Sequence, residues 1–167
     1  LDIEKLAAGK LQFEPGWVDL PEQLRQAAAG MAAYAGDSST GVELAAEAPA
    51  VRLHVDERRL QQILSNLLSN AIKFSPRGSR VGLAAVMAGD RVRISVTDQG
   101  KGVPESFRTH IFQRFAQADS SDRREQGGTG LGLAISKELT EQMGGRIGFD
   151  SPPGEGATFW VELPCYK

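Results

Sequence analysis

The sequence predicts an α/β protein, a two-layer sandwich in which a mixed, mostly antiparallel sheet is covered on one face by about three helices. Two observations predict this class. Segments with alternating apolar residues, which are typical of strands, form hairpins rather than a regular β-α-β alternation. Three further segments have the periodicity of helices. The chain has 167 residues, which is enough for one domain with its own apolar core.

The first part of the chain predicts a boundary followed by a strand and a helix. Residues 1–12 have a loosely helical pattern that ends at Pro15 and Gly16, so we expect 1–12 to be the tail of a preceding helix and 13–167 to be the domain. Trp17–Leu20 is a short strand candidate. Pro21–Tyr34 is rich in alanine and predicts a helix with proline in its first turn.

The strongest helix pattern follows two further strand candidates, Val42–Ala46 and Val51–Val55. Asp56 is a suitable N-cap for a helix over Glu57–Phe74, and Ser75-Pro76 ends it. One face of this helix is apolar and comprises Leu60, Ile63, Leu64, Leu67, Leu68, Ala71 and Phe74. A polar stripe runs along one edge of that face and comprises Arg59, Gln62, Asn66, Asn70 and Lys73.

The second half of the chain predicts a hairpin, a helix and two more strands. Val81–Met87 and Val92–Val96 alternate around a turn at Gly89-Asp90. A helix that begins after a run of glycines reaches Met143 and stops at Gly144-Gly145. Strand patterns follow around Ile147 and Phe149 and over Ala157–Leu163.

Composition and charge exclude several classes of function. The net charge is −2 and there is no basic run, so we expect no nucleic-acid partner and no direct membrane contact. Cys165 is the only cysteine, which excludes an internal disulfide framework and favours a reducing, cytoplasmic location. No apolar run approaches the roughly 18 residues that a spanning helix requires.

The glycine-dense stretch Gly127–Leu133 leads directly into the third predicted helix. Glycine has no Cβ, so main-chain N–H groups can approach a bulky anion, and the positive end of the helix dipole favours negative charge there. A phosphate chain is the ligand that this pattern indicates. The stretch is not a P-loop, because Leu133 and Ala134 follow the last glycine where that motif has lysine and a hydroxyl residue.

Three motifs stand in order along the chain: Asn66–Phe74, Asp98-x-Gly100-x-Gly102 and the glycine turn, with Phe112-x-x-Phe115 between the last two. This set resembles the ATP-binding catalytic domain of two-component sensor histidine kinases, within the superfamily that includes gyrase, Hsp90 and MutL. The resemblance covers about residues 13–163 and implies the Bergerat ATP-binding fold, a two-layer sandwich that agrees with the periodicities.

The resemblance implies that these motifs bind ATP and Mg²⁺. Asp98 would accept the exocyclic N–H of adenine and reject guanine, while Gly100 and Gly102 let the backbone approach the base. Asn70 would offer an amide oxygen to Mg²⁺, and Lys73 a positive charge to the phosphates. The other expected nucleotide contacts are Phe115 and the lid residues Arg123 and Arg124, and in the glycine turn Gly128, Thr129, Gly130, Leu131, Gly132 and Leu133.

Position 66 bears on the reaction. In superfamily members that hydrolyse ATP, a glutamate one turn before the magnesium-binding asparagine is the general base. Asn66 stands there in this chain, and an amide cannot take a proton at neutral pH. Asn66, Asn70 and Lys73 are therefore expected to serve phosphoryl transfer to a histidine. A conformational ATPase of the Hsp90 or gyrase type and a non-catalytic nucleotide-binding interaction module are the alternatives.

The resemblance also implies partners that this chain does not contain. Neither His54 nor His110 has the His-Glu-Leu-Arg-like context of the family's phosphoacceptor. The acceptor is expected on a dimerisation domain of the same protein, with a response-regulator receiver domain as the next partner. The full-length protein, with or without a membrane anchor, is expected to be a homodimer and the isolated chain a monomer.

Relatives often place a hydroxyl residue after the glycine at position 156. Ala157 stands there in this chain, so that contact with adenine is not expected.

Overall fold

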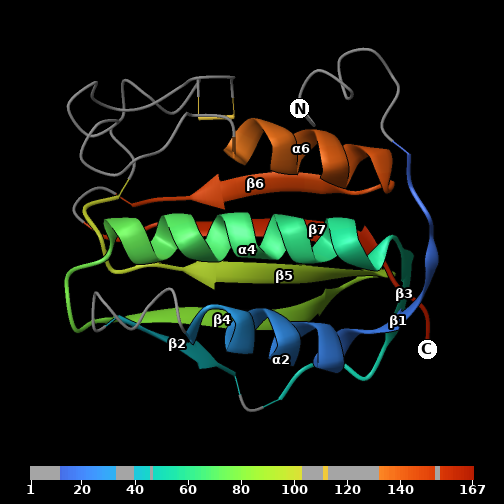
Figure 1. Ribbon diagram of the computed structural model, residues 1–167, viewed down its shortest axis with the longest axis horizontal. Coiled ribbons are helices and arrows are strands. Elements are labelled where there is room, and N and C mark those ends of the chain that lie inside the picture. The colour runs from blue at the N-terminus through green and yellow to red at the C-terminus, as the bar shows by residue number, and fades with distance from the viewer. Residues whose placement is uncertain (1–11, 33–39, 46, 103–110, 113–131, 153–154) are drawn as a thin grey trace.

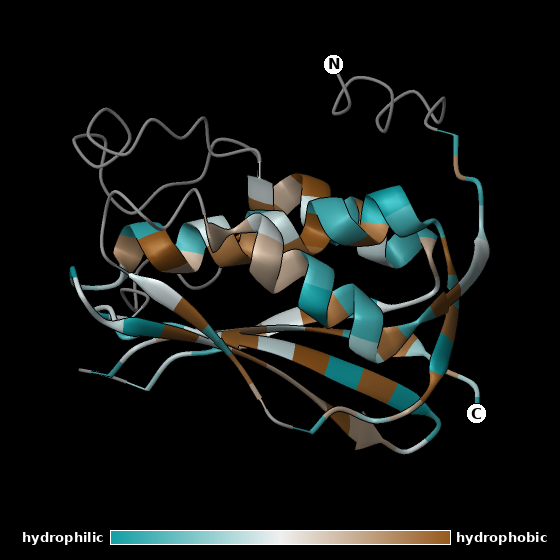
Figure 2. Cartoon of the chain, turned by 60° about the horizontal axis from the view of Figure 1, so that its bottom comes forward, coloured by the Kyte–Doolittle hydropathy of each residue, from teal (hydrophilic) through white to brown (hydrophobic). Residues whose placement is uncertain are grey.

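The computed structural model describes residues 12–32, 40–45, 47–102, 111–112, 132–152 and 155–167. Within them the helices form one layer and the main sheet the other (Figures 1 and 2). This confirms the predicted two-layer α/β sandwich. No helix among these residues is long and apolar enough to cross a bilayer.

The described chain forms a five-stranded sheet and a separate two-stranded sheet. The elements in order are β1 Gly16–Asp19, α2 Leu20–Gly30, β2 Gly41–Leu44, β3 Arg52–Val55, α4 Glu57–Phe74, β4 Arg80–Ala88, β5 Arg91–Thr97, α6 Gly132–Gln142, β6 Arg146–Asp150 and β7 Thr158–Pro164. The strand order in the large sheet is β2-β4-β5-β7-β6. Only the β2–β4 pair is parallel, so the sheet is mixed and mostly antiparallel, as predicted. Strands β1 and β3 pair separately.

Local sequence signals place the helix ends. Asp56 caps α4, because its Oδ1 accepts from the N–H groups of Arg58 (3.0 Å) and Arg59 (3.3 Å). Its second oxygen accepts from the N–H of Glu14 at 2.8 Å, which ties the segment before β1 to this helix. The predicted helix over Pro21–Tyr34 is confirmed as far as Gly30, where α2 ends, while residues 33–34 lie outside the described residues. Gly144 follows α6 with φ 81°, a left-handed conformation that favours glycine.

The core lies between α4 and the large sheet. Leu60, Ile63 and Leu64 are completely inaccessible to solvent, as are Val92 and Ile94 on β5. The predicted apolar face of α4 is confirmed over Leu60–Ala71, but the prediction for Phe74 is wrong because its side chain is 53% exposed. Ile72 is buried in its place, since it lies one turn after Leu68.

The other face of the sheet carries a buried carboxylate held by two arginines. The strand register places Glu162 of β7 opposite Arg93 of β5 and Arg146 of β6. The Glu162 side chain is only 4% exposed. Oε2 accepts from Nε of Arg93 at 2.7 Å, and Oε1 accepts from Nε of Arg146 at 2.8 Å. The hydrogen bond from Arg146, aided by that from Arg93, holds the pKa of Glu162 below its ordinary value, although burial acts in the opposite direction.

This ion pair makes the fold sensitive to acid. Because the pKa of Glu162 is lowered on folding, its ionised form stabilises the fold above the unfolded-state pKa of about 4.3, and the stabilisation is lost as the pH falls through the folded-state pKa. Glu162→Gln should lower the free energy of unfolding by about 1–3 kcal/mol near neutral pH. Its stability should also decline less than that of the native chain between about pH 7 and about pH 3 in urea titrations.

Glu22→Gln is the matched control, because Glu22 forms its ion pair with Arg25 on the exposed surface of α2. This variant should unfold almost as the native chain does. Equal effects of the two substitutions would contradict the role given to Glu162.

Candidate functional site

Three segments that are distant in sequence meet at one end of the sheet. They are the polar edge of α4, the loop 98–102 after β5, and the segment just before β7 that contains Gly156. A Cβ on Gly100 would collide with the carbonyl oxygen of Phe74, and one on Gly156 with the carbonyl oxygen of Asp98. The start of α6 joins them through Asn66 of α4, whose Nδ2 donates to the carbonyl oxygen of Gly132 at 3.4 Å.

Asp98 is buried at the centre of this region, with 7% of its surface exposed. It follows β5 directly, and its N–H continues the ladder to β7 by donating to the carbonyl oxygen of Ala157 at 2.9 Å. Oδ1 accepts from the N–H groups of Gly100 (2.9 Å) and Ala157 (3.1 Å). Oδ2 accepts no hydrogen bond from the part of the chain that the structure describes. One oxygen therefore fixes the carboxylate, and the other can accept an N–H from a ligand.

The glycines of the loop are required by contacts within the protein. Gly102 has φ 84°, and a Cβ there would lie 2.5 Å from the carbonyl oxygen of Glu155 and 2.7 Å from Oγ of Ser151. Gly100 packs against the last turn of α4, and the N–H of Gln99 donates to Oγ of Ser75 at 3.2 Å. These contacts give a packing reason for both glycines, while their approach to a base stays a prediction.

The polar edge of α4 lies between this loop and α6. Asn66, Asn70 and Lys73 are all half-buried and recur at helical spacing, so they follow one edge. Nδ2 of Asn66 also donates to Oγ of Ser136 at 3.3 Å. Within the described residues, the side chains of Asn70 and Lys73 make no hydrogen bond or ion pair. An amide oxygen and an ammonium group are therefore available side by side for a ligand.

Ser136 and Ser75 are two residues at this site that the sequence analysis did not identify. Ser136 is completely buried on α6, and its hydroxyl joins that helix to Asn66 of α4. A small polar residue one turn after Gly132 on the inner face of a helix was the available signal. Ser75 follows α4 and holds Gln99. In the sequence its position indicates only the end of a helix.

Several predicted residues lie outside the described part of the chain. These are Phe115, Arg123, Arg124, Gly128, Thr129, Gly130 and Leu131, together with His110 and the proposed lid. Gly132 and Leu133 are described and form the first turn of α6. Phe112 is also described. Its ring contacts those of Phe149 and Phe159 edge-on, with centroid distances of 6.1 and 6.3 Å, beside the end of the sheet that holds Asp98.

Comparisons with known proteins agree with this architecture. Residues 55–167 match the family model described as histidine kinase-, DNA gyrase B-, and HSP90-like ATPase. The sensor protein GacS of Pseudomonas syringae pv. syringae is 44% identical over 100% of this chain, which spans 19% of that protein. The chain thus belongs to this ATPase family, in the branch of the sensor histidine kinases.

Solved structures show the same relationship. Full-length ShkA in complex with AMPPNP superposes with a TM-score of 0.84 at 38% identity, over 98% of this chain and 34% of that one. The catalytic domain of the histidine kinase ThkA superposes with a TM-score of 0.77 at 26% identity, over 90% of this chain and 95% of that one. The chain corresponds to the ATP-binding catalytic domain of a sensor histidine kinase.

The close contact between Gly156 and Asp98 can be tested directly. In Gly156→Ala the new Cβ would displace the carbonyl oxygen of Asp98 and lengthen the 3.1 Å hydrogen bond from Ala157 to the Asp98 carboxylate. We expect the free energy of unfolding to fall by about 1–3 kcal/mol, measured by urea unfolding.

Gly16→Ala is the matched control, because a Cβ there meets nothing within 4 Å. It should leave the unfolding midpoint nearly unchanged. A Gly156→Ala chain as stable as the Gly16→Ala chain would show that the loop before β7 does not hold Asp98.

Proposed function

We propose that this chain binds Mg²⁺·ATP and transfers the γ-phosphoryl group to a histidine on a separate dimerisation domain. The observation that carries the proposal is Asp98, a buried carboxylate with one oxygen held by two main-chain N–H groups. Its second oxygen accepts nothing from the described chain. A buried acceptor of this kind is stabilised when a ligand donates an N–H to it.

The proposed partner of Asp98 Oδ2 is the exocyclic amine of adenine. Guanine has a carbonyl oxygen at the corresponding position, and two acceptors cannot share a hydrogen bond. The site would therefore select ATP over GTP. Thr158 does not replace the hydroxyl that relatives often have after Gly156, because its Oγ1 lies 3.0 Å from that of Thr97.

The α4 edge fits the metal and the phosphate chain. Mg²⁺ prefers oxygen ligands, and the half-buried Asn70 has an amide oxygen with no partner in the described chain. When bound, the ion would neutralise charge on the phosphates. Lys73 would add a positive charge one turn further along this edge. The first turn of α6, including Gly132 and Leu133, would add main-chain N–H groups and the positive end of a helix dipole.

Asn66 would position the site rather than take a proton. Its amide joins α4 to Gly132 and Ser136 of α6, so it holds the two helices between which the phosphates would lie. An amide is not a base at neutral pH. This favours transfer to a nucleophile that needs no activation, such as a neutral imidazole. In that step a P–N bond forms as the bond to the ADP oxygen breaks, and the imidazole N–H proton leaves to solvent.

The acceptor histidine and the further partners would lie outside this chain. His54 is on the exposed side of β3, where its ring lies 4.8 Å from that of Trp17. We assign it no part in the transfer. The proposed partners are the dimerisation domain of the same protein, to which residues 1–12 would lead, and a receiver domain that takes the phosphoryl group from the histidine. The parent protein would act as a homodimer.

Adenine recognition can be tested with Asp98→Asn. The amide presents a donor where the carboxylate oxygen would accept, so ATP affinity should fall about 10- to 100-fold, as expected for a lost hydrogen bond to a charged group. GTP should lose less affinity or gain some. Titration calorimetry with each nucleotide and Mg²⁺ would measure both effects.

Asp90→Asn is the matched control, because Asp90 is an exposed carboxylate at the other end of β5. It should bind ATP as the native chain does. Unchanged ATP affinity in a folded Asp98→Asn chain would show that Asp98 does not bind adenine.

The reaction can be tested by mixing the chain with γ-radiolabelled ATP, Mg²⁺ and the separate dimerisation domain of its parent protein. We expect acid-labile, alkali-stable label on that domain, as for a phosphohistidine, and almost no label on the chain itself. Steady phosphate release without labelling would instead support a conformational ATPase. Failure to bind any adenine nucleotide would support a non-catalytic interaction module.

A further inference from the structure

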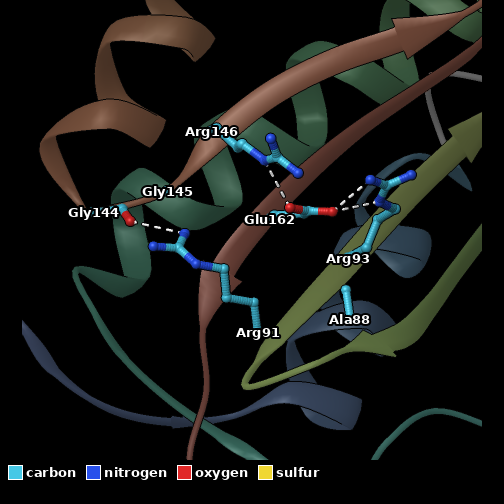
Figure 3. A pocket seen from close by; sticks show the side chains of 7 residues that line it. All are labelled: Ala88, Arg91, Arg93, Gly144, Gly145, Arg146 and Glu162. Atoms are coloured by element: carbon cyan, nitrogen blue, oxygen red, sulfur yellow. Dashed lines mark hydrogen bonds and ion pairs between the residues drawn. The ribbon is translucent and has the colours of Figure 1, made fainter.

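A second candidate site lies on the face of the sheet that the helices leave uncovered. A depression with a volume of about 690 Å³ is lined by Arg91, Arg93, Arg146 and Glu162, with Ala88 and the Gly144-Gly145 pair at its margin (Figure 3). The three arginines come from the starts of β5 and β6. Arg91 precedes Asp98 by seven residues along β5, or roughly 23 Å at the rise of a strand. The depression is therefore separate from the nucleotide site.

Glu162 holds two of the guanidinium groups in place. Figure 3 shows Arg146 and Arg93 pointing toward it from opposite sides, and each bonds a different carboxylate oxygen. Nη2 of Arg93 also lies 2.6 Å from Oε2. The indole ring of Trp160 supports both arginines, with its centroid 4.1 Å from Cζ of Arg93 and 5.5 Å from Cζ of Arg146. The two groups are ordered before any ligand arrives, which reduces the entropy cost of binding.

Arg91 is anchored in a different way. Its Nη1 donates to the carbonyl oxygen of Gly144 at 3.0 Å, at the end of α6. It has no contact with Glu162 among the described interactions, so it is not needed to neutralise that buried carboxylate. Arg91 is therefore not a structural part of the Glu162 ion pair.

The lining residues have a net charge of +2, from three arginines and one glutamate, in a chain whose net charge is −2. A guanidinium has five N–H donors. Arg146 uses only Nε and Arg91 only Nη1 in hydrogen bonds within the described chain, so most of their donors stay available. Such donors match carboxylates in geometry as well as in charge.

We propose that this depression is a docking site for an acidic protein segment that presents at least two carboxylates. Three guanidinium groups from two strands border the depression, so a segment with two or more carboxylates can contact more of them than a single small anion can. The site lies on a sheet face that none of the described helices covers, which an extended segment can reach. Because the nucleotide site is at the other end of the strands, the segment and ATP would bind together.

The test uses the whole chain and a short fluorescein-labelled peptide of alternating aspartate and glycine, followed by fluorescence anisotropy at low ionic strength. Arg91→Gln should weaken binding about fivefold. Arg91→Lys keeps the charge but loses the planar fork, so it should fall between the native chain and Arg91→Gln. Neither change touches the Glu162 ion pair, and the hydrogen bond from Arg91 to Gly144 is exposed, so the free energy of unfolding should change little.

Arg58→Gln is the matched control, because Arg58 is an exposed arginine in the first turn of α4 on the other layer. It should bind the peptide as the native chain does, and saturation with AMPPNP should not displace the peptide. Equal weakening by Arg58→Gln and Arg91→Gln would overturn the proposal. Displacement of the peptide by AMPPNP would also overturn it. So would displacement by inorganic phosphate, if chloride at the same ionic strength does not displace the peptide.

Discussion

Burial of the apolar face of α4 against the five-stranded sheet is the interaction on which the rest of this domain depends. Leu60, Ile63, Leu64 and Leu68 of α4 are completely inaccessible, as is Ile94 on the central strand. Each buried side chain of this size contributes about 1.5–3 kcal/mol. Because one face of the helix packs against the core, its rotation about its own axis is fixed. Asn66, Asn70 and Lys73 therefore lie along one edge, where Asn66 contacts α6.

The same packing brings the acid and amide groups of the site together. The last turn of α4 presents the carbonyl oxygen of Phe74 to Gly100, and two hydrogen bonds between Asp98 and Ala157 join that loop to the residue before β7. The proposed nucleotide site is thus built on a helix edge and a strand end that belong to the core. Rigid supports of this kind favour binding because little order must be created when the ligand arrives.

The two faces of the sheet have different chemistry, and each is organised by one buried carboxylate. On the helix side Asp98 is held by main-chain N–H groups, and its second oxygen, which accepts nothing from the described residues, is the proposed acceptor for a ligand. On the other side both carboxylate oxygens of Glu162 accept hydrogen bonds from Arg93 and Arg146. The groups still able to form hydrogen bonds there are the remaining N–H donors of the arginines. The first arrangement suits a ligand that donates hydrogen bonds, and the second suits an anion.

The sequence by itself determined the fold class and the bounds of α4, because periodicity and capping residues are local properties of the chain. Asn70 and Asp98 became candidates through the resemblance of their motifs to those of a known family. The tertiary structure decided what depends on neighbours distant in sequence. In the tertiary structure Phe74 is exposed and Ile72 is buried, and Gly100 packs against the carbonyl group of Phe74. Strand pairing also places Arg93 and Arg146 around Glu162. Strand pairing brings those residues together, and pairing between distant strands leaves no local pattern in the sequence.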